Sequence, residues 1–302
     1  MHPTIPAVFF EISRTAVSTC TAGIVLLLIG LLATTRDFAE AHGLDNVVAL
    51  ANLCFAVPLA VFGVEHFAEA KSIMELVPAY VPGRLFWTYF VGVALLAASL
   101  SIATKIHVRW SGLLFGIMMF LFVAMMDIPG VLSDRHNRIA WVLLLRELSF
   151  GAGGWILAGD ALASRDRPGT SKLITLGRIV IGIAAIVYGV QHFLHPENVP
   201  GVPLEKLTPA WIPARLLIDY LTGVILLVAG GCILLARQTR TAATYLGTWI
   251  LVLVVFLYGP ILIAALLDPG PAVQLEGINY FFDTLLFSGT ILALASATPP
   301  AG

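Results

Sequence analysis

The feature that most constrains the fold of this chain is a series of long apolar runs. Nine runs of about twenty residues follow one another, and each can cross the roughly 30 Å hydrocarbon core of a bilayer as a helix. The alternation of apolar and polar residues that is typical of membrane barrel strands does not occur in these runs. We therefore expect an all-α, polytopic integral membrane protein with spans at about 15–35, 46–69, 84–105, 109–130, 138–163, 173–194, 214–236, 241–266 and 273–297.

The composition excludes several other classes of protein. Apolar residues make up 59% of the 302 residues and charged residues only 12%, about half of the roughly 25% that soluble domains carry. The formal net charge of −1 provides no basic field that would attract nucleic acid. The three cysteines lie inside apolar runs without a second cysteine at metal or redox spacing. A soluble enzyme, a disulfide-stapled secreted domain and a disordered chain are thus excluded.

An internal repeat covers four of the expected helices twice. Val61–Phe67 (VFGVEHF) matches Val187–Phe193 (VYGVQHF), and Pro78–Arg84 (PAYVPGR) matches Pro209–Arg215 (PAWIPAR). Because each copy makes an even number of crossings, both copies should have the same orientation and be related by a pseudo-two-fold axis along the membrane normal. The expected organisation is an N-terminal helix and loop in 1–45, a first four-helix repeat in 46–163, a linker in 164–172 and a second repeat in 173–302.

The distribution of Lys and Arg over the loops predicts the orientation in the membrane. The loops after the first, third, fifth and seventh runs carry more of these residues, whereas the loops at the opposite end carry most of the acids. We therefore expect the N-terminus outside and the C-terminus in the cytoplasm, in a bacterial inner (plasma) membrane. The expected partners are the lipid bilayer and other membrane or redox subunits, and nucleic acid is not among them.

Short motifs recur in the same order in both repeats. A glycine-containing first helix precedes a proline-rich loop, a helix with Gly and Leu follows, and an acidic residue precedes glycine in the last helix. In the first copy the motifs are Phe62–Phe67 (FGVEHF), Tyr89–Leu96 (YFVGVALL) and Arg146–Gly153 (RELSFGAG), and in the second copy they are Tyr188–Phe193 (YGVQHF), Tyr220–Leu227 (YLTGVILL) and Asp283–Gly289 (DTLLFSG).

This order of motifs resembles the DoxX-like family of four-helix membrane proteins, over 46–163 and again over 173–298. The chain departs from that family in being a fused pair with an added helix, and in carrying His66 and His192 where many members have Lys. Some members are membrane subunits of quinone-reducing sulfur oxidation, and others are assembly factors or oxidoreductase-associated scaffolds. The resemblance therefore implies a fold far more than it implies a reaction.

Ionisable residues inside the apolar runs are the first candidates for function. Each costs about 2.5–3.5 kcal/mol at the bilayer centre unless it faces a partner or a cavity. Arg146 and Glu147 lie near mid-membrane, and Asp283 aligns with Glu147 in the second repeat. Because adjacent helix residues point about 100° apart, we expect Arg146 and Glu147 to need partners on other helices. Together with Asp127 and Asp219, these residues are expected to anchor the helices or to relay protons.

A second group of polar and aromatic residues lies nearer the outer face, and two interpretations of it stay open. In the first, Arg84 and Arg215 clamp the buried carboxylates, and Arg215 forms an ion pair with Asp219 four residues later. In the second, they line an outward-opening pocket in each half, which suits a quinone or lipid head group. The predicted ligand-binding residues are His66, His192, Arg84, Arg215, Tyr89, Tyr220, Trp87 and Trp211.

The histidines also raise the question of a metal or haem. His66 and Glu69 are three residues apart at a helix end, as are His192 and His195, and this spacing can bind metal. Two ligands in each half do not close a site, so we expect structural histidines, or a histidine that exchanges a proton with a bound quinol. No catalytic residue is assigned. A quinone is compatible with these residues, haem and metal are disfavoured, and the cofactor stays unknown.

Three functional hypotheses follow from these features. The leading one is a redox-accessory or quinone- or lipid-binding membrane subunit of a larger assembly, which would be enzymatic only as part of a quinone-linked oxidoreductase. The second is a transporter of a small solute, because repeated bundles with buried charge at their junction also describe carriers. The third is a structural scaffold or assembly factor without ligand chemistry.

Overall fold

The computed structural model describes residues 12–163 and 170–299, so that part of the expected linker, 164–169, lies outside the described residues. Within the described ranges, nine helical segments are long and apolar enough to cross a membrane. This confirms the expected all-α polytopic fold and its nine spans. The described residues form no β-strand, and their only β-bridge joins Asn198 to Leu207.

Several spans are built from more than one helical segment. The elements are α1 (Arg14–Glu40), α2 (Asp45–Val48), α3 (Ala51–Ala68), α4 (Ala70–Leu76), α5 (Arg84–Ala103), α6 (Val108–Phe122), η1 (Val123–Asp127), α7 (Ile128–Ser133), α8 (Arg138–Ala163), α9 (Thr170–Leu194), α10 (Arg215–Leu234), α11 (Thr239–Leu253), η2 (Val254–Tyr258), α12 (Gly259–Leu266) and α13 (Pro271–Ser296).

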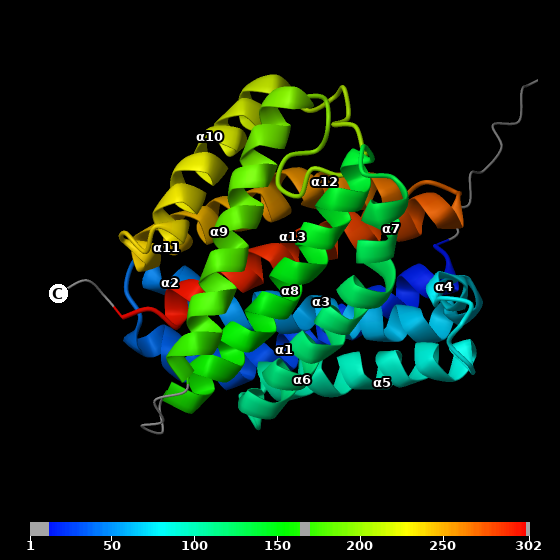
Figure 1. Cartoon of the computed structure of the whole chain (residues 1–302), viewed down its shortest axis with the longest axis horizontal. Helices are drawn as coiled ribbons and strands as arrows, with labels where there is room; N and C mark the ends of the chain where they lie inside the picture. The colour runs from blue at the N-terminus through cyan, green and yellow to red at the C-terminus, as the bar shows by residue number, and fades with distance from the viewer. Residues whose placement is uncertain (1–11, 164–169, 300–302) are drawn as a thin grey trace, which may run out of the picture.

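Two helices, α8 and α13, lie at the centre of the bundle and contact each other (Figure 1). On one side α3 packs against α13 and α6 against α8, with α5 joining α3 to α6. On the other side α9 packs against α8 and α11 against α13, with α10 joining α9 to α11. Within its apolar window 72% of α13 is buried, against 28% of α1, which packs outside α3 and α5. The central pair is therefore the place where both halves of the chain meet.

Small residues allow the closest helix contacts, as expected where lipid supplies no hydrophobic drive for helix association. A Cβ atom added to Gly92 of α5 would lie 3.1 Å from the Gly63 oxygen of α3. The same contact recurs in the second half, where a Cβ atom on Gly223 of α10 would lie 3.2 Å from the Gly189 oxygen of α9. The two halves therefore form their first helix pair by the same backbone approach.

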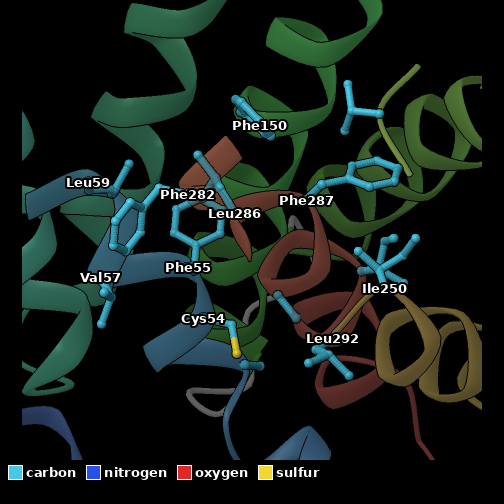
Figure 2. Close-up of a cluster of buried hydrophobic side chains, with 14 of the residues drawn as sticks. Cys54, Phe55, Val57, Leu59, Phe150, Ile250, Phe282, Leu286, Phe287 and Leu292 are labelled. Carbon is cyan, nitrogen blue, oxygen red and sulfur yellow. The ribbon is translucent and has the colours of Figure 1, made fainter. Parts of the chain in front are cut away.

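Aromatic side chains fill the space around the central helices. Phe55 of α3 and Phe282 of α13 lie next to each other, and Phe150 of α8 lies above them in Figure 2. Phe55 is fully buried, and α3 crosses α13 so closely that a Cβ atom on Gly289 would lie 2.5 Å from the Phe55 backbone nitrogen. Packing at this crossing has no room for an additional methyl group.

The crossing of α3 and α13 predicts a sharp difference between two glycines. Gly289→Ala should lower the free energy of unfolding by about 1–3 kcal/mol, because the clash is with backbone that cannot rotate away. Gly231→Ala is the matched control, since a Cβ atom at Gly231 of α10 meets nothing within 4 Å. The thermal unfolding midpoint in detergent, followed by tryptophan fluorescence, measures both. Equal midpoints for the two variants would contradict the packing described here.

Candidate functional site

A cluster of charges joins the two central helices. Arg146 of α8 donates from Nη1 to Oδ2 of Asp283 on α13 at 2.7 Å. It also donates from Nη2 and Nε to Oε1 of Glu147, at 2.7 and 3.2 Å. Because α8 begins at Arg138 and α13 at Pro271, this cluster lies more than two helical turns inside both spans. The Arg146 guanidinium is thus a bridge between the two halves of the chain.

The expectation that Arg146 and Glu147 would not pair with each other was wrong. Their Cβ atoms point in different directions, but the long Arg146 side chain bends back and reaches the neighbouring carboxylate. The expected partner on another helix is present for Arg146, in the form of Asp283. Helix geometry alone therefore underestimates the reach of a flexible guanidinium.

The two halves contribute unequally to this cluster. Glu147 and Asp283 occupy aligned positions of the repeat, whereas the position of Arg146 is held by Phe282 in the second half. Two carboxylates alone at the junction of the halves would repel each other in a medium of low dielectric. A single arginine that bonds both carboxylates removes this repulsion.

Two further carboxylates lie within electrostatic reach of the cluster. Glu65 of α3 is buried and accepts a hydrogen bond from Nδ2 of Asn279 at 3.1 Å, and it interacts with Asp283. Asp127 lies in the π-helical segment η1, where its buried Oδ2 atom has no hydrogen-bond partner among the described residues, and it interacts with Glu147. One guanidinium thus bonds two carboxylates, and two further carboxylates interact with those two. Because unpaired carboxylates are costly to bury, the excess must be neutralised by protons or by cations.

The cluster is not sealed by hydrophobic packing. The side chains of Arg146, Glu147 and Asp283 keep 19%, 16% and 12% of their surface exposed, although they lie deep in their spans. Fully packed core side chains such as Phe55 and Phe287 keep none. Protein side chains therefore do not enclose the charges completely.

The π-helical segments explain how one of these carboxylates is presented. Pro129 and Pro260 have no N–H group, and each follows a π-helical segment, η1 or η2, in which the regular helix register is interrupted. Asp127 ends the first of these segments and Tyr258 the second, at aligned positions. The interrupted register turns both residues toward the interior.

The two aligned histidines have different surroundings. In both, Nδ1 bonds the backbone oxygen four residues earlier, at 2.7 Å in His66 and 2.6 Å in His192. His192 is fully buried, and its Nε2 atom accepts a hydrogen bond from the Gly201 N–H at 2.9 Å. His66 is half-buried, and its Nε2 atom has no hydrogen-bond partner within the described ranges. The difference arises from the loop at 195–214, which is longer than its counterpart in the first half and folds back onto His192.

The arginines at the starts of α5 and α10 do not act as clamps. Among the described residues neither Arg84 nor Arg215 forms an ion pair with a buried carboxylate, and that role falls to Arg146. The expected ion pair between Arg215 and Asp219 is also not formed. Arg215 lies at the first residue of α10, where its guanidinium turns outward to the Thr208 oxygen at 3.4 Å, whereas Asp219 faces His192.

The predicted aromatic walls lie on the outside of the bundle. Tyr89 stacks on Phe67 at 5.5 Å and Tyr220 on Phe193 at 5.8 Å between ring centroids. These tyrosines are exposed, as are Trp87 and Trp211, which is typical of an interfacial aromatic belt. The structure therefore does not bring the predicted ligand-binding residues together. One hollow of about 440 Å³ contains only Arg215 of that set and is lined by Glu197, Leu207, Thr208, Pro209, Ala210, Arg215 and Leu216.

The residues considered for metal binding have other partners. Glu69 accepts a hydrogen bond from Thr15 Oγ1 at 2.7 Å, and His195 Nδ1 lies 3.4 Å from Glu197 Oε1. Across the described part of the chain, no group of three or more His, Cys, Asp or Glu side chains is arranged to hold a metal ion.

Sequence reasoning missed several residues of the site. Glu65 lies inside the repeated motif FGVEHF, at the position of Gln191 in the second copy. An acid at this position of an apolar run is a sequence signal that could have identified it. Asn279 replaces the aligned Leu143, and its role depends on its contact with Glu65.

Comparisons of the chain with protein-family models, with curated proteins and with solved structures give no match. Function is therefore argued from the geometry of this cluster.

The bridge predicts that loss of Arg146 is far more costly than loss of an exposed arginine. Arg146→Gln should lower the free energy of unfolding by about 3–5 kcal/mol, because it leaves buried carboxylates unpaired. The loss should shrink between about pH 8 and about pH 5, since protonation removes the unpaired charges. Arg215→Gln is the control and should change stability by about 0.5 kcal/mol or less. A pH-independent loss, or equal losses in both variants, would contradict the bridge.

Proposed function

We propose that this chain is a DoxX-like integral membrane protein that serves as a redox-accessory, quinone- or lipid-binding subunit of a larger membrane assembly. Its working centre in this proposal is the cluster of Arg146, Glu147, Asp283, Glu65 and Asp127, and its chemistry is the exchange of protons. The observation that carries the proposal is the excess of carboxylates near a single arginine, in a cluster that protein side chains do not enclose completely.

A purely structural clamp would need only a balanced pair of charges. Arg146 with Asp283 would satisfy that need, yet Glu147, Glu65 and Asp127 add negative charge that no further cation of the described chain offsets. A carboxyl group that holds a proton can donate it and later accept another. Reduction of a quinone to a quinol consumes two protons with two electrons, and this chain would supply proton carriers while a partner subunit supplies the electrons.

The polar side chains also outline a route to the cluster. Glu69 is the C-cap of α3, and Glu65 lies one helical turn deeper on the same helix face. Glu65 bonds Asn279, and Asp283 lies one further turn along α13. The steps within α3 and α13 are each about one helical turn, roughly 6 Å of rise, and the step between the helices is the 3.1 Å hydrogen bond. These groups lead from the end of the bundle where α13 begins to the central bridge, which supports exchange of protons with that side.

A second candidate function is transport of a small cationic solute. It is favoured by the same excess of negative charge at the junction of two repeats, because carriers place their binding sites there. Uptake of a cation into proteoliposomes that contain the protein, without any redox partner, would favour transport over the redox-accessory role.

Infrared spectroscopy tests whether the cluster holds exchangeable protons. In nanodiscs titrated between about pH 5 and about pH 9, protonated carboxyl groups should give carbonyl stretching bands. Glu65→Gln and Asp127→Asn should each remove one band, because each deletes a carboxyl that lacks a cationic partner. Glu276→Gln, which removes a surface carboxylate paired with Lys206, is the matched control. Spectra without any such band in the wild-type protein would reject the proton-exchange centre.

Native mass spectrometry in mild detergent tests the ligand. We expect a quinone-like molecule to stay bound to the wild-type protein, and the combined Glu65→Gln and Asp127→Asn variant to retain less of it. His66→Ala should also lower retention, because His66 Nε2 is available for a ligand whereas His192 Nε2 is bonded to Gly201. Retention of phospholipid only would reject the quinone and leave a lipid-binding role. Retention of nothing would reject both.

A further inference from the structure

The middle of the loop between α9 and α10 is buried against the helical bundle. Residues Val199–Leu204 are all buried, and the loop contacts Tyr258 of η2 and Tyr280 of α13 (Figure 1). Tyr258 donates from its hydroxyl to the Pro200 oxygen at 2.9 Å, and Arg138 donates to the Pro203 oxygen at 2.7 Å. The Lys206 N–H donates to the Tyr280 hydroxyl at 3.0 Å. Side chains thus satisfy backbone groups that regular structure does not.

The bond from Gly201 to His192 fixes the state of the imidazole. Nδ1 of His192 lies 2.6 Å from the Tyr188 oxygen, which can only accept, so Nδ1 carries a hydrogen. Nε2 accepts the Gly201 N–H and therefore carries a lone pair. While the loop is docked, His192 is the neutral tautomer and cannot donate from Nε2.

Asp219 faces this lone pair. Its Oδ1 atom lies 3.8 Å from Nε2 of His192, its Oδ2 atom has no hydrogen-bond partner among the described residues, and its side chain is 2% exposed. Since His192 offers no hydrogen, an ionised Asp219 would be an unpaired charge in a dry site, which costs several kcal/mol. Asp219 must therefore hold a proton while the loop is docked.

The other groups around this pair do not supply a compensating positive charge. Arg138 donates to the backbone oxygens of Pro203 and Leu204, and Arg215 to that of Thr208. The remaining titratable groups that interact with Asp219 are acidic or neutral: Glu197 of the loop and Tyr258 of η2.

We propose that Asp219 and His192 form a proton-binding site that latches the loop at 195–214 in the bundle. The docked loop holds a proton on Asp219, and loss of that proton to solvent leaves a carboxylate beside a lone pair, which releases the loop toward water. Above about pH 7 a released His192 is neutral, as the docked one is, so the docked form binds one more proton than the released form. In that range docking weakens as the pH rises.

Release of the loop would also uncover one side of the central cluster. A Cβ atom on Gly201 would lie 3.4 Å from Cγ2 of Thr284, which neighbours Asp283. This consequence rests on the proposed function, whereas the latch itself does not. The latch would make access to the cluster depend on proton concentration at the end of the bundle where α13 begins.

Hydrogen–deuterium exchange of the full-length protein in nanodiscs tests the latch. The amides of 195–208 should be protected at about pH 6, and their protection factor, corrected for intrinsic exchange, should fall toward about pH 9. One linked proton limits the fall to about tenfold per pH unit. Asp219→Asn mimics the protonated acid and should keep the loop protected at every pH. Glu205→Gln, an exposed carboxylate in the same loop, should behave as the wild type does.

A second variant keeps the test decisive if Asp219→Asn does not fold. Gly201 has a φ of +119°, which side chains rarely adopt, so Gly201→Ala should leave the loop unprotected at both pH values. Wild-type protection that does not change with pH, pH dependence that survives in Asp219→Asn, or full protection in Gly201→Ala would overturn the latch. None of these results bears on the infrared bands of Glu65 and Asp127, so failure of the latch and failure of the proton-exchange centre are distinguishable.

Discussion

Arg146 and Asp283 join the two central helices at a depth where neither charge can be left unpaired. A buried ion pair adds little net stability compared with apolar packing, but breaking it is costly, so its main effect is to specify one arrangement. The glycine contacts between helices permit close approach without selecting a register along the helix axis. The bridge between α8 and α13 selects the register of these two helices, and the helices on both sides pack against α8 and α13.

The two halves share a scaffold and differ in the residues that matter for chemistry. The shared features are the glycine contacts of the first helix pair, the π-helical segments and the carboxylates at the junction. The first half contains the additional acidic residues of the cluster, and the second half contains the latch. The aligned pairs that differ are Arg146 and Phe282, Glu65 and Gln191, Asp127 and Tyr258, Thr88 and Asp219, and Asn279 and Leu143. A symmetric scaffold therefore carries an asymmetric site.

The spans and the depth of Arg146, Glu147 and Asp283 could be predicted, because both depend on local apolar periodicity and on helix rise. The partners of Arg215 and Asp219 could not be predicted. The helix period places both residues on one face, but it does not determine the direction in which each side chain extends from that face. Glu65 was readable as an acid within an apolar run. The packing of the loop at 195–214 against the bundle could not be predicted. It depends on hydrogen bonds to His192, Tyr258 and Arg138, which come together only when the chain folds.

The loop at 195–214 and its counterpart in the first half satisfy their backbones in different ways. In the first half α4 (Ala70–Leu76) forms its own helical hydrogen bonds, which do not depend on the rest of the bundle. In the second half the corresponding backbone depends on side chains such as His192 and Tyr258, which must all be in place at once. Buried irregular backbone is tolerated only while such partners are present. A change at one partner, such as the loss of a proton from Asp219, therefore weakens the whole loop in the second half, and the first half has no comparable point of release.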